Sequence, residues 1–398
     1  MPLLNAPGIT RREFLLASSV AAGGVLFAGC VPPKHEVQAE SRVRMAEDIL
    51  SAYDNWYATT CRGCQAGCGL VVRVVDGRAR KAEGNPDHPI NRGKLCARGQ
   101  AVVQEQYHPD RVRGPLARNA SGALEPISWN GALDELGARL GALRAQGRAG
   151  DVALISPPLR GHRALLVDTF ARAYGLQWLP FEPLPELPLA EAARRVFGMD
   201  RLPRFDVQNA RMVLSFGADF LGGWLSPVQF GIQYGIFRQG SYDTGEHFAP
   251  RGADRPRGRL VHVSTRFSST AASADEWVWV RPGHEGLLAL SVAQALGGPV
   301  SEDVAPERTA ERTGVSAARV RRLAAALTEQ QPALVIAGGS AGSYTNGTLT
   351  LSNILSLNLL LGNVGRAGGV LASAPSPLGR HRAGTVAGSP PYPADRCR

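Results

Sequence analysis

Four cysteines in one stretch are the residues of this chain best suited to chemistry. They follow the spacing Cys61-x2-Cys64-x3-Cys68 and then, after a longer interval, Cys96. A cubane iron–sulfur cluster needs four thiolates that converge on one roughly spherical object, and three close cysteines plus a distant one supply that geometry. The loop is rich in glycine, which lets a backbone wrap tightly. The spacing predicts one [4Fe-4S] cluster with these four cysteines as metal ligands.

Two other uses of the four cysteines stay open at this point. A structural zinc site usually shows two short Cys-x2-Cys pairs, whereas this chain has one. Two disulfides are the other alternative, because exported proteins favour them. The chain holds two further cysteines, Cys30 near its N-terminus and Cys397 near its C-terminus. The sequence names no partner for Cys397, so a free thiol is expected there.

Residues 1–30 resemble a twin-arginine export signal. Arg11 and Arg12 precede Phe14 and Leu15, and an apolar stretch rich in Ala and Gly follows over residues 17–28. That stretch is shorter than the roughly 20 residues of a bilayer span, so an export address is favoured over a transmembrane helix. The twin-arginine resemblance implies export of the folded protein with its cofactor inserted, which weakens the disulfide alternative. We expect a periplasmic location or the outer face of the cytoplasmic membrane.

Cys30 is a candidate lipidation site. It closes the run Leu26-Phe27-Ala28-Gly29-Cys30, which is similar to a lipoprotein signal in which a small residue precedes the cysteine that takes lipid, although Phe27 is atypical at its position. Lipid on Cys30 would anchor the chain to a membrane without spanning it. The charged, Pro-containing residues 31–50 are then expected to form a tether.

The composition is that of a folded globular protein. With 44% hydrophobic, 20% charged and 7% aromatic residues, it excludes a disordered, collagen-like or polytopic membrane protein. A length of 398 residues predicts two or three packed units. The 44 Lys and Arg against 34 Asp and Glu leave a net charge of +10, but the basic residues are scattered without an aromatic-interleaved stripe. No nucleic-acid partner is expected.

Apolar runs and helical patterns alternate after the cysteines. Ser128 is placed to cap a helix with Leu133, Leu136, Leu140 and Leu143 on one face. The alternation predicts an α/β fold built around mainly parallel sheets. The predicted strands are 152–155, 212–216, 260–263, 277–280 and 334–337, and the predicted helices are 164–174, 287–296 and 316–327.

A longer motif surrounds the fourth cysteine. Residues 93–99 read GKLCARG, and residues 107–111 read YHPDR. Together with the cysteine spacing, these segments resemble the N-terminal iron–sulfur domain of the molybdopterin oxidoreductases of the bis-molybdopterin guanine dinucleotide type, the DMSO reductase superfamily. The resemblance implies a small [4Fe-4S] domain followed by Rossmann-like, mainly parallel α/β domains. It also implies that Arg98, two places after the fourth cysteine, lies between cluster and pterin as a cofactor-binding residue; a solvated surface charge is the alternative.

Later segments extend the resemblance to about residue 372. They include SFGAD at 215–219, RPGHEG at 281–286 and LGNVG at 361–365. In catalytic members, loops of this kind at the carboxyl ends of strands hold two pterin dinucleotides, and the similar loop Gly338-Gly339-Ser340 has amides that suit a phosphate. The expected domains are the iron–sulfur domain at 51–118, a Rossmann-like domain at 119–204 and 301–372, a second α/β domain at 205–300, and a Pro-rich tail at 373–398.

The pterin site departs from the family pattern. Catalytic members present a Ser, Cys, selenocysteine or Asp to molybdenum, whereas residues 174–187 offer only the carboxylates of Glu182 and Glu186. The family's Asp-Pro-Arg is replaced by residues 264–266 (STR), and its Pro-Gly-Thr-Asp by residues 282–285 (PGHE). The resemblance also ends before the family's C-terminal pterin-binding barrel. These differences argue against molybdopterin guanine dinucleotide and leave the catalytic residues unknown.

One branch of the family fits these departures. The Pro-rich window at 182–188 and the segment at 219–227 look like the large iron–sulfur subunit of the alternative complex III, a quinol:electron-acceptor oxidoreductase. The resemblance implies an exported subunit that relays electrons through one [4Fe-4S] cluster in a membrane-associated respiratory complex. Its implied partners are a ferredoxin-like iron–sulfur subunit and a membrane quinol-site subunit. The alternatives are a molybdenum or tungsten oxidoreductase of the polysulfide or thiosulfate reductase type, and a cofactor-free scaffold.

Overall fold

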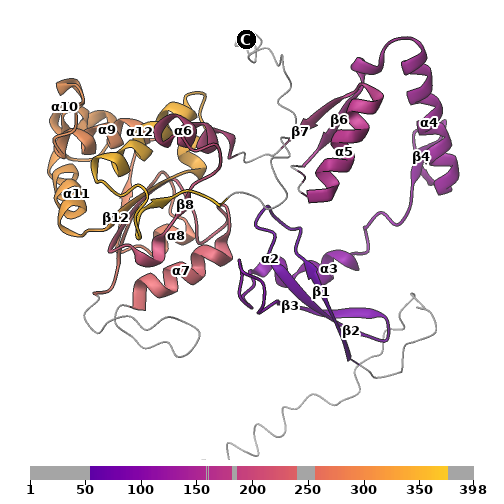
Figure 1. Ribbon diagram of the computed structural model, residues 1–398, viewed down its shortest axis with the longest axis horizontal. Coiled ribbons are helices and arrows are strands. Elements are labelled where there is room, and N and C mark those ends of the chain that lie inside the picture. The colour runs from indigo at the N-terminus through magenta and orange to yellow at the C-terminus, as the bar shows by residue number, and fades with distance from the viewer. Residues whose placement is uncertain (1–53, 158, 160, 182–185, 240–255, 375–398) are drawn as a thin grey trace, which may run out of the picture. The chain divides into compact units, whose positions relative to one another are not determined.

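A computed structural model of the chain gives the fold (Figure 1). It describes residues 54–157, 159, 161–181, 186–239 and 256–374, and every structural statement below concerns these residues. The expected signal, tether and lipidation site lie outside them, as do Glu182, Cys397 and residues 375–398. The chain divides into two units, one of residues 1–55 with 73–80 and one of residues 56–72 with 81–398.

The first described segment is a three-stranded sheet followed by two short helices. The strands lie in the order β1-β2-β3. Asp76 and Gly77 join the second strand to the third, and both have positive φ, as two-residue hairpin turns require. The two long connections, 61–68 and 85–96, carry the four cysteines. The elements are β1 (Asp54–Thr60), β2 (Gly69–Val75), β3 (Arg78–Gly84), α2 (Ala97–Gln100) and α3 (Val102–Gln106).

Residues 116–181 form helices and strands that leave much apolar surface open; we call them the 116–181 lobe. Ser128 caps its first helix by accepting a hydrogen bond from the amide of Gly131. Leu133 and Leu136 on that helix are 58% and 53% exposed. Parallel sheets are normally covered on both faces, but the lobe has only one parallel strand pair, β6 with β7. Its elements are β4 (Leu116–Arg118), β5 (Leu124–Pro126), α4 (Trp129–Ala145), η1 (Ala149–Asp151), β6 (Ala153–Ser156), α5 (Gly161–Tyr174) and β7 (Gln177–Pro180).

A four-stranded parallel sheet forms the centre of the rest of the chain. The strands lie in the order β11-β10-β9-β12, and Ser215 of β9 pairs in register with His262 of β10 and Ile336 of β12. Every residue of β9 and β12 is buried, as their continuous apolar runs predict for strands covered on both faces. The strands are β9 (Met212–Phe216), β10 (Arg259–Ser264), β11 (Glu276–Trp279) and β12 (Ala333–Ala337).

Helices cover both faces of this sheet. Figure 1 shows α7 and α8 on one side and α6, α9 and α12 on the other. The edge strand β12 is protected by Asn358 of α12, whose side-chain amide accepts from the backbone amide of Val335 and donates to its carbonyl. The helices are α6 (Leu187–Phe197), α7 (Pro227–Gln239), α8 (Ser269–Ala272), α9 (Glu285–Ala295), α10 (Pro306–Thr313), α11 (Ala317–Glu329) and α12 (Gly347–Leu360). Short elements complete the fold: β8 (Arg204–Phe205), η2 (Val207–Asn209), η3 (Glu302–Val304), η4 (Gly339–Gly342) and β13 (Val370–Leu371).

The predicted elements and fold class are confirmed. The five predicted strands correspond to β6, β9, β10, β11 and β12, and the three predicted helices to α5, α9 and α11. The helix after Ser128 also forms, but on its leucine face Leu133 and Leu136 are exposed and Leu140 and Leu143 are only half-buried. In the described part of the chain, no helix is both long and apolar enough to cross a membrane.

Candidate functional site

The four candidate cluster ligands come from two loops. Cys61 follows β1, Cys64 and Cys68 lie in the loop before β2, and Cys96 directly precedes α2. The backbone amide of Cys61 donates a 2.7 Å hydrogen bond to the carbonyl of Cys68, which closes the first loop on itself. Gly67 makes the turn before Cys68 with a φ of +63°, a conformation that glycine adopts without strain. All four thiols are free.

The thiols gather on one small apolar cluster. Cys68 is buried together with Ala66 and Val228, and the other three cysteines, with Leu95 and Ile232, pack against that group. Burial, together with the nearby thiols of Cys64, Cys61 and Cys96, raises the pKa of the Cys68 thiol to about 11. Because Val228 and Ile232 belong to α7, the thiol site rests directly on the helix that follows the β9 loop.

Asn91 fixes the second cysteine loop against the first. Its side chain is fully buried. Its amide oxygen accepts from the backbone amide of Gly69, and its amide nitrogen donates to the carbonyls of Gly69 and Lys94. These bonds tie the residue after Cys68 to the approach to Cys96. Sequence reasoning missed Asn91, because an asparagine among turn residues carries no periodic signal.

The chemistry of the thiols suits a cluster. Four cysteine side chains that gather around one apolar group are the ligand set of a [4Fe-4S] cluster, whose own iron and sulfide atoms lie between the four sulfurs. Among the described residues, no group of three His, Cys, Asp or Glu side chains is arranged to hold a single metal ion. The four-thiol site therefore offers the number and type of ligands that a [4Fe-4S] cluster requires.

Arg98 lies beside both the thiol site and the loop after β9. It belongs to α2, two residues after Cys96, and its side chain is exposed. A side-chain carbon added at Gly223 would lie 3.9 Å from its Nη2 atom. The guanidinium thus sits close to the Gly222-Gly223 turn of the β9 loop.

The carboxyl ends of the parallel strands form a second candidate region. From β9 the chain adds β10 and then β11 in one direction across the sheet, and it then returns to place β12 on the other side of β9. The strand order therefore reverses between β9 and β12. Open α/β sheets bind ligands at such a switch point. The loops that meet there begin at Gly217 and Gly338, and the amide of Ser340 donates to the carbonyl of Gly217.

Asp219 holds this region together. Its Oδ1 atom accepts hydrogen bonds from the backbone amide of Thr270 at 3.0 Å and from the Thr270 hydroxyl at 2.8 Å. Its other carboxylate oxygen lies 3.6 Å from the Arg266 guanidinium. The carboxylate therefore couples the loop after β9 to α8, which follows β10.

Two buried polar groups near the strand ends lack hydrogen bonds among the described residues. The indole Nε1 of Trp224 is buried beside Gly338, where an added side-chain carbon would lie 2.4 Å away. Glu285, the first residue of α9, is buried with both carboxylate oxygens unpartnered. Burial raises the pKa of Glu285. The backbone amides of Glu285 and Gly283 oppose this rise, but neither meets the geometry of a hydrogen bond to the carboxylate. Unpartnered buried groups of this kind often mark a ligand.

Two family models match this chain. The molybdopterin oxidoreductase Fe4S4 domain matches residues 54–108, and the molybdopterin oxidoreductase model matches residues 111–385. The chain belongs to the molybdopterin oxidoreductase family. The family expected from the motif around Cys96 is confirmed, and so is the [4Fe-4S] cluster as the cofactor of its N-terminal domain.

Individual relatives agree with this family but are longer. The menaquinone reductase molybdopterin-binding-like subunit of Nitratidesulfovibrio vulgaris is 30% identical over 381 residues, covering 92% of this chain and 52% of that protein. The thiosulfate reductase molybdopterin-containing subunit of Salmonella typhimurium is 26% identical over 392 residues, covering 91% of this chain and 47% of that protein. The chain spans about half the length of these curated relatives.

A solved structure shares the fold. Acetylene hydratase from Pelobacter acetylenicus superposes with a TM-score of 0.61 at 19% sequence identity, covering 80% of this chain and 45% of that one. This likeness confirms the α/β fold.

This molybdopterin oxidoreductase chain fits a pterin nucleotide in part. The unpartnered groups of Trp224 and Glu285 follow the carboxyl ends of β9 and β11, and a bound pterin would supply a molybdenum or tungsten centre for redox chemistry. Ser264, which replaces a family carboxylate, accepts from the indole of Trp277 and donates to the carbonyl of Arg266, so it serves local structure. Glu186 directly precedes α6 without capping it through its side chain.

Proposed function

We propose that this chain is an exported iron–sulfur subunit that relays electrons through one [4Fe-4S] cluster in a membrane-associated respiratory complex. Cys61, Cys64, Cys68 and Cys96 ligate the cluster. The observation that carries the proposal is the convergence of four free thiols on one apolar cluster. Uptake and release of an electron change only the cluster's charge, so the protein has no bond to make or break. Its task is to hold the cluster and tune its potential.

Arg98 is proposed to adjust that potential. Its guanidinium lies beside the Gly223 turn, two residues from a proposed ligand. A cation near the cluster stabilises the more negative, reduced state by Coulomb attraction. The position between the thiol site and the β9 loop supports a role between the cluster and any second centre held at the strand ends.

The proposed partners are a ferredoxin-like iron–sulfur subunit and a membrane quinol-site subunit. One relative is named as a subunit of a menaquinone reductase, which supports a place in a respiratory complex. The 116–181 lobe also supports contact with further polypeptide, since Leu133, Leu166 and Phe170 are among its exposed apolar side chains.

Metal and sulfide analysis tests the proposed relay. The full chain would be expressed with residues 1–30, purified without oxygen and analysed for iron, sulfide, molybdenum and tungsten. We expect about four irons and four sulfides per chain without molybdenum or tungsten. Zinc in place of iron, or no metal, would refute the relay, and the latter would favour a scaffold.

Export has its own test. The double variant Arg11→Lys, Arg12→Lys should remain in the cytoplasm, because a twin-arginine signal requires both guanidinium groups. Normal localisation of this variant would refute the proposed route.

A Cys30→Ser variant should be exported but released from the membrane fraction, whereas unchanged membrane attachment would exclude a lipid on Cys30 as the anchor.

The second candidate function is catalysis at a molybdenum or tungsten pterin. The buried, unpartnered groups of Trp224 and Glu285 favour it. Stoichiometric molybdenum or tungsten in the same metal analysis would establish this alternative. A Trp224→Phe variant would then lose the metal while keeping its iron, because the substitution removes the indole N–H together with part of a buried ring, and thermal unfolding would verify that the variant is folded.

A further inference from the structure

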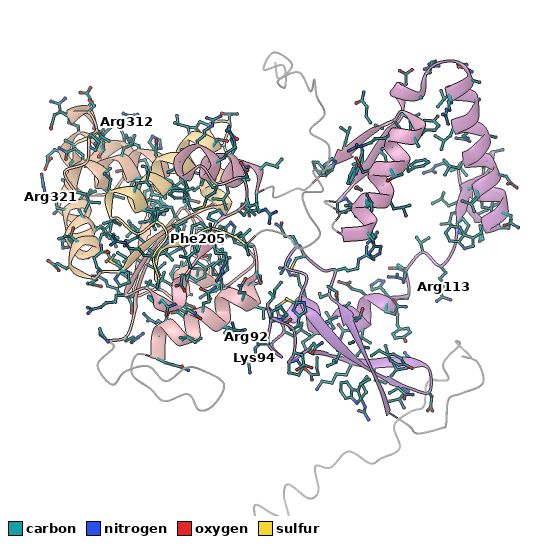
Figure 2. All side chains as sticks on the ribbon, in the orientation of Figure 1. Arg92, Lys94, Arg113, Phe205, Arg312 and Arg321 are labelled. Atoms are coloured by element: carbon teal, nitrogen blue, oxygen red, sulfur yellow. The ribbon has the colours of Figure 1, made fainter. Side chains whose placement is uncertain are left out.

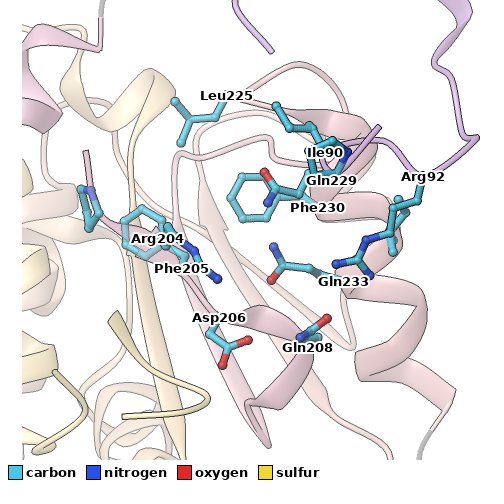
Figure 3. A pocket seen from close by; sticks show the side chains of 13 residues that line it. Ile90, Arg92, Arg204, Phe205, Asp206, Gln208, Leu225, Gln229, Phe230 and Gln233 are labelled. Atoms are coloured by element: carbon cyan, nitrogen blue, oxygen red, sulfur yellow. The ribbon is translucent and has the colours of Figure 1, made fainter. Parts of the chain in front are cut away.

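A cavity of about 150 Å³ lies between the second cysteine loop, the β8 segment and the first turns of α7 (Figure 3). Its walls come from three stretches that are distant in sequence. These are residues 89–92, residues 203–208, and residues 225–233 at the start of α7. The lining takes Leu225 from the end of the loop after β9 and includes none of the four cysteines.

The base of the cavity is apolar and firmly packed. Phe205 and Phe230 line it and are only 3% and 5% exposed. Both rings contact the indole of Trp224, with ring centroids 5.7 Å and 5.4 Å apart. Because these rings belong to the main hydrophobic core, the base of the cavity is held in place by core packing.

The rim presents hydrogen-bond donors. Arg92 and Arg204 line the cavity with exposed side chains, and neither guanidinium has an ion pair within the described ranges. Gln233 directs its Oε1 atom to the backbone amide of Val207 at 2.9 Å, which leaves its Nε2 hydrogens for the cavity. Figure 3 shows the side chains of Arg92 and Gln233 directed toward this space.

The acidic side chain in the cavity lining already has hydrogen-bond partners. Asp206 is the acidic residue among the lining side chains. Its carboxylate accepts from the side-chain amide of Asn209 through both oxygens and from the backbone amide of Gly368. Asp206 therefore fixes the local backbone and leaves the two guanidinium groups without a competing partner.

Backbone strain also concentrates at this cavity. Three described residues other than glycine have positive φ, and two of them, Arg92 at +42° and Leu225 at +51°, line it. Residues other than glycine rarely adopt a positive φ, and such backbone outliers cluster at ligand sites. In Arg92 the strained backbone holds a guanidinium at the cavity rim.

We propose that this cavity binds a small oxyanion. Guanidinium groups match the paired oxygens of carboxylates and tetrahedral oxyanions, and Gln233 Nε2 supplies a further donor. The volume is ample for an ion of about five heavy atoms with a water molecule. Such an ion would link the loop that leads to Cys96 with α7, which contacts Cys68. The proposal does not depend on the proposed electron relay.

Isothermal titration calorimetry tests the site. The intact, cluster-loaded chain would be titrated with sulfate, phosphate, thiosulfate and acetate at constant ionic strength set by chloride. We expect one saturable site, and preference between acetate and the other three distinguishes a planar carboxylate from a tetrahedral ion. Absence of saturable binding by all four anions would overturn the proposal.

Matched variants locate the binding. Arg92→Ala and Arg204→Ala should each weaken the affinity at least tenfold, and Gln233→Glu should abolish binding by placing a negative charge in the cavity. Arg312→Ala removes an exposed guanidinium from α10 (Figure 2) and should leave the affinity unchanged. Thermal unfolding would verify that each variant is folded. Unchanged affinity in both cavity arginine variants, or an equal loss in Arg312→Ala, would overturn the assignment.

Discussion

The backbone amide of Cys61 donates a hydrogen bond of 2.7 Å to the carbonyl oxygen of Cys68. This bond brings the first and third cysteines of the motif together through the main chain alone, so both side chains stay available for metal. Asn91 then joins Gly69 to the loop that leads to Cys96. The four-thiol site is thus positioned by one main-chain hydrogen bond and by the bonds of the Asn91 side chain.

Cys68→Ser should abolish the cluster. Cys68 is the most buried of the four thiols, and a hydroxyl is a poor substitute for a thiolate toward iron. We expect the iron content to fall from about four per chain toward zero, with loss of the paramagnetic resonance signal of the reduced cluster. Cys397→Ser is the matched control and should keep both. An unchanged spectrum in Cys68→Ser would contradict its role as a ligand.

Arg98→Ala should lower the reduction potential of the cluster. Removal of a nearby cation destabilises the reduced state, and the exposed position of Arg98 limits the shift to tens of millivolts, on the order of that expected for a screened charge pair. Arg98→Lys, which keeps the charge, should retain most of the potential. A redox titration at low and high salt provides the measurement, and a potential that stays constant in Arg98→Ala would count against the proposed placement.

Gly217→Ala should destabilise the fold more than Gly362→Ala. Both glycines have a φ of +66°, so both substitutions carry the left-handed penalty of roughly 1–2 kcal/mol. At Gly217 the added carbon would also lie 2.5 Å from the amide nitrogen of Ala341, whereas at Gly362 nothing lies within 4 Å. We expect a further loss of about 1–3 kcal/mol at Gly217 from this overlap. Denaturant unfolding measures both, and equal losses would show that the β9 and β12 loops can separate at no cost.

His262 should make the fold less stable in acid. Burial lowers the pKa of His262 to about 4 from an ordinary value of 6.5. In the unfolded chain the His262 imidazole therefore binds a proton below pH 6.5, whereas in the folded chain it binds one only below about pH 4. This histidine costs no stability above pH 6.5, and it lowers the free energy of unfolding by about 3 kcal/mol as the pH drops from 6.5 to 4.

The matched variant for this effect is His262→Gln. Its unfolding free energy should lack that part of the acid loss, which denaturant titrations across the same pH range would reveal. Glu285 has a raised pKa and acts with the opposite sign, because its stabilisation is lost as the pH rises. Its contribution is common to both proteins and cancels in the difference. Parallel pH profiles would contradict the prediction for His262.

The sequence predicted the central sheet well because its strands are short apolar runs between glycine-rich turns. The run at 212–216 is buried along its whole length, so pattern and burial agree. It also predicted Cys61, Cys64, Cys68 and Cys96 as a group, and the structure brings them to one apolar cluster. The spacing predicted this grouping, because ligands of one compact cluster are expected to be close in space.

Other features were beyond the sequence because they depend on tertiary contacts. Nothing in the chain near Val228 indicates that it packs against Cys68, since the two residues are far apart in sequence. The pairing of Asp219 with Thr270 likewise joins two loops that meet only when the sheet has formed. The leucine face of α4 was predicted from its period, but a period gives the direction of an apolar face and not the partner that covers it.

The open faces of the 116–181 lobe have a consequence for the amount of this protein in a cell. Exposed apolar side chains such as Leu133, Leu166 and Phe170 are what holdase chaperones and quality-control proteases recognise. We therefore expect a chain with this lobe uncovered to be degraded faster than one whose lobe is covered by another polypeptide. Its steady-state level would then follow the supply of whatever covers the lobe, so that assembly itself sets the stoichiometry.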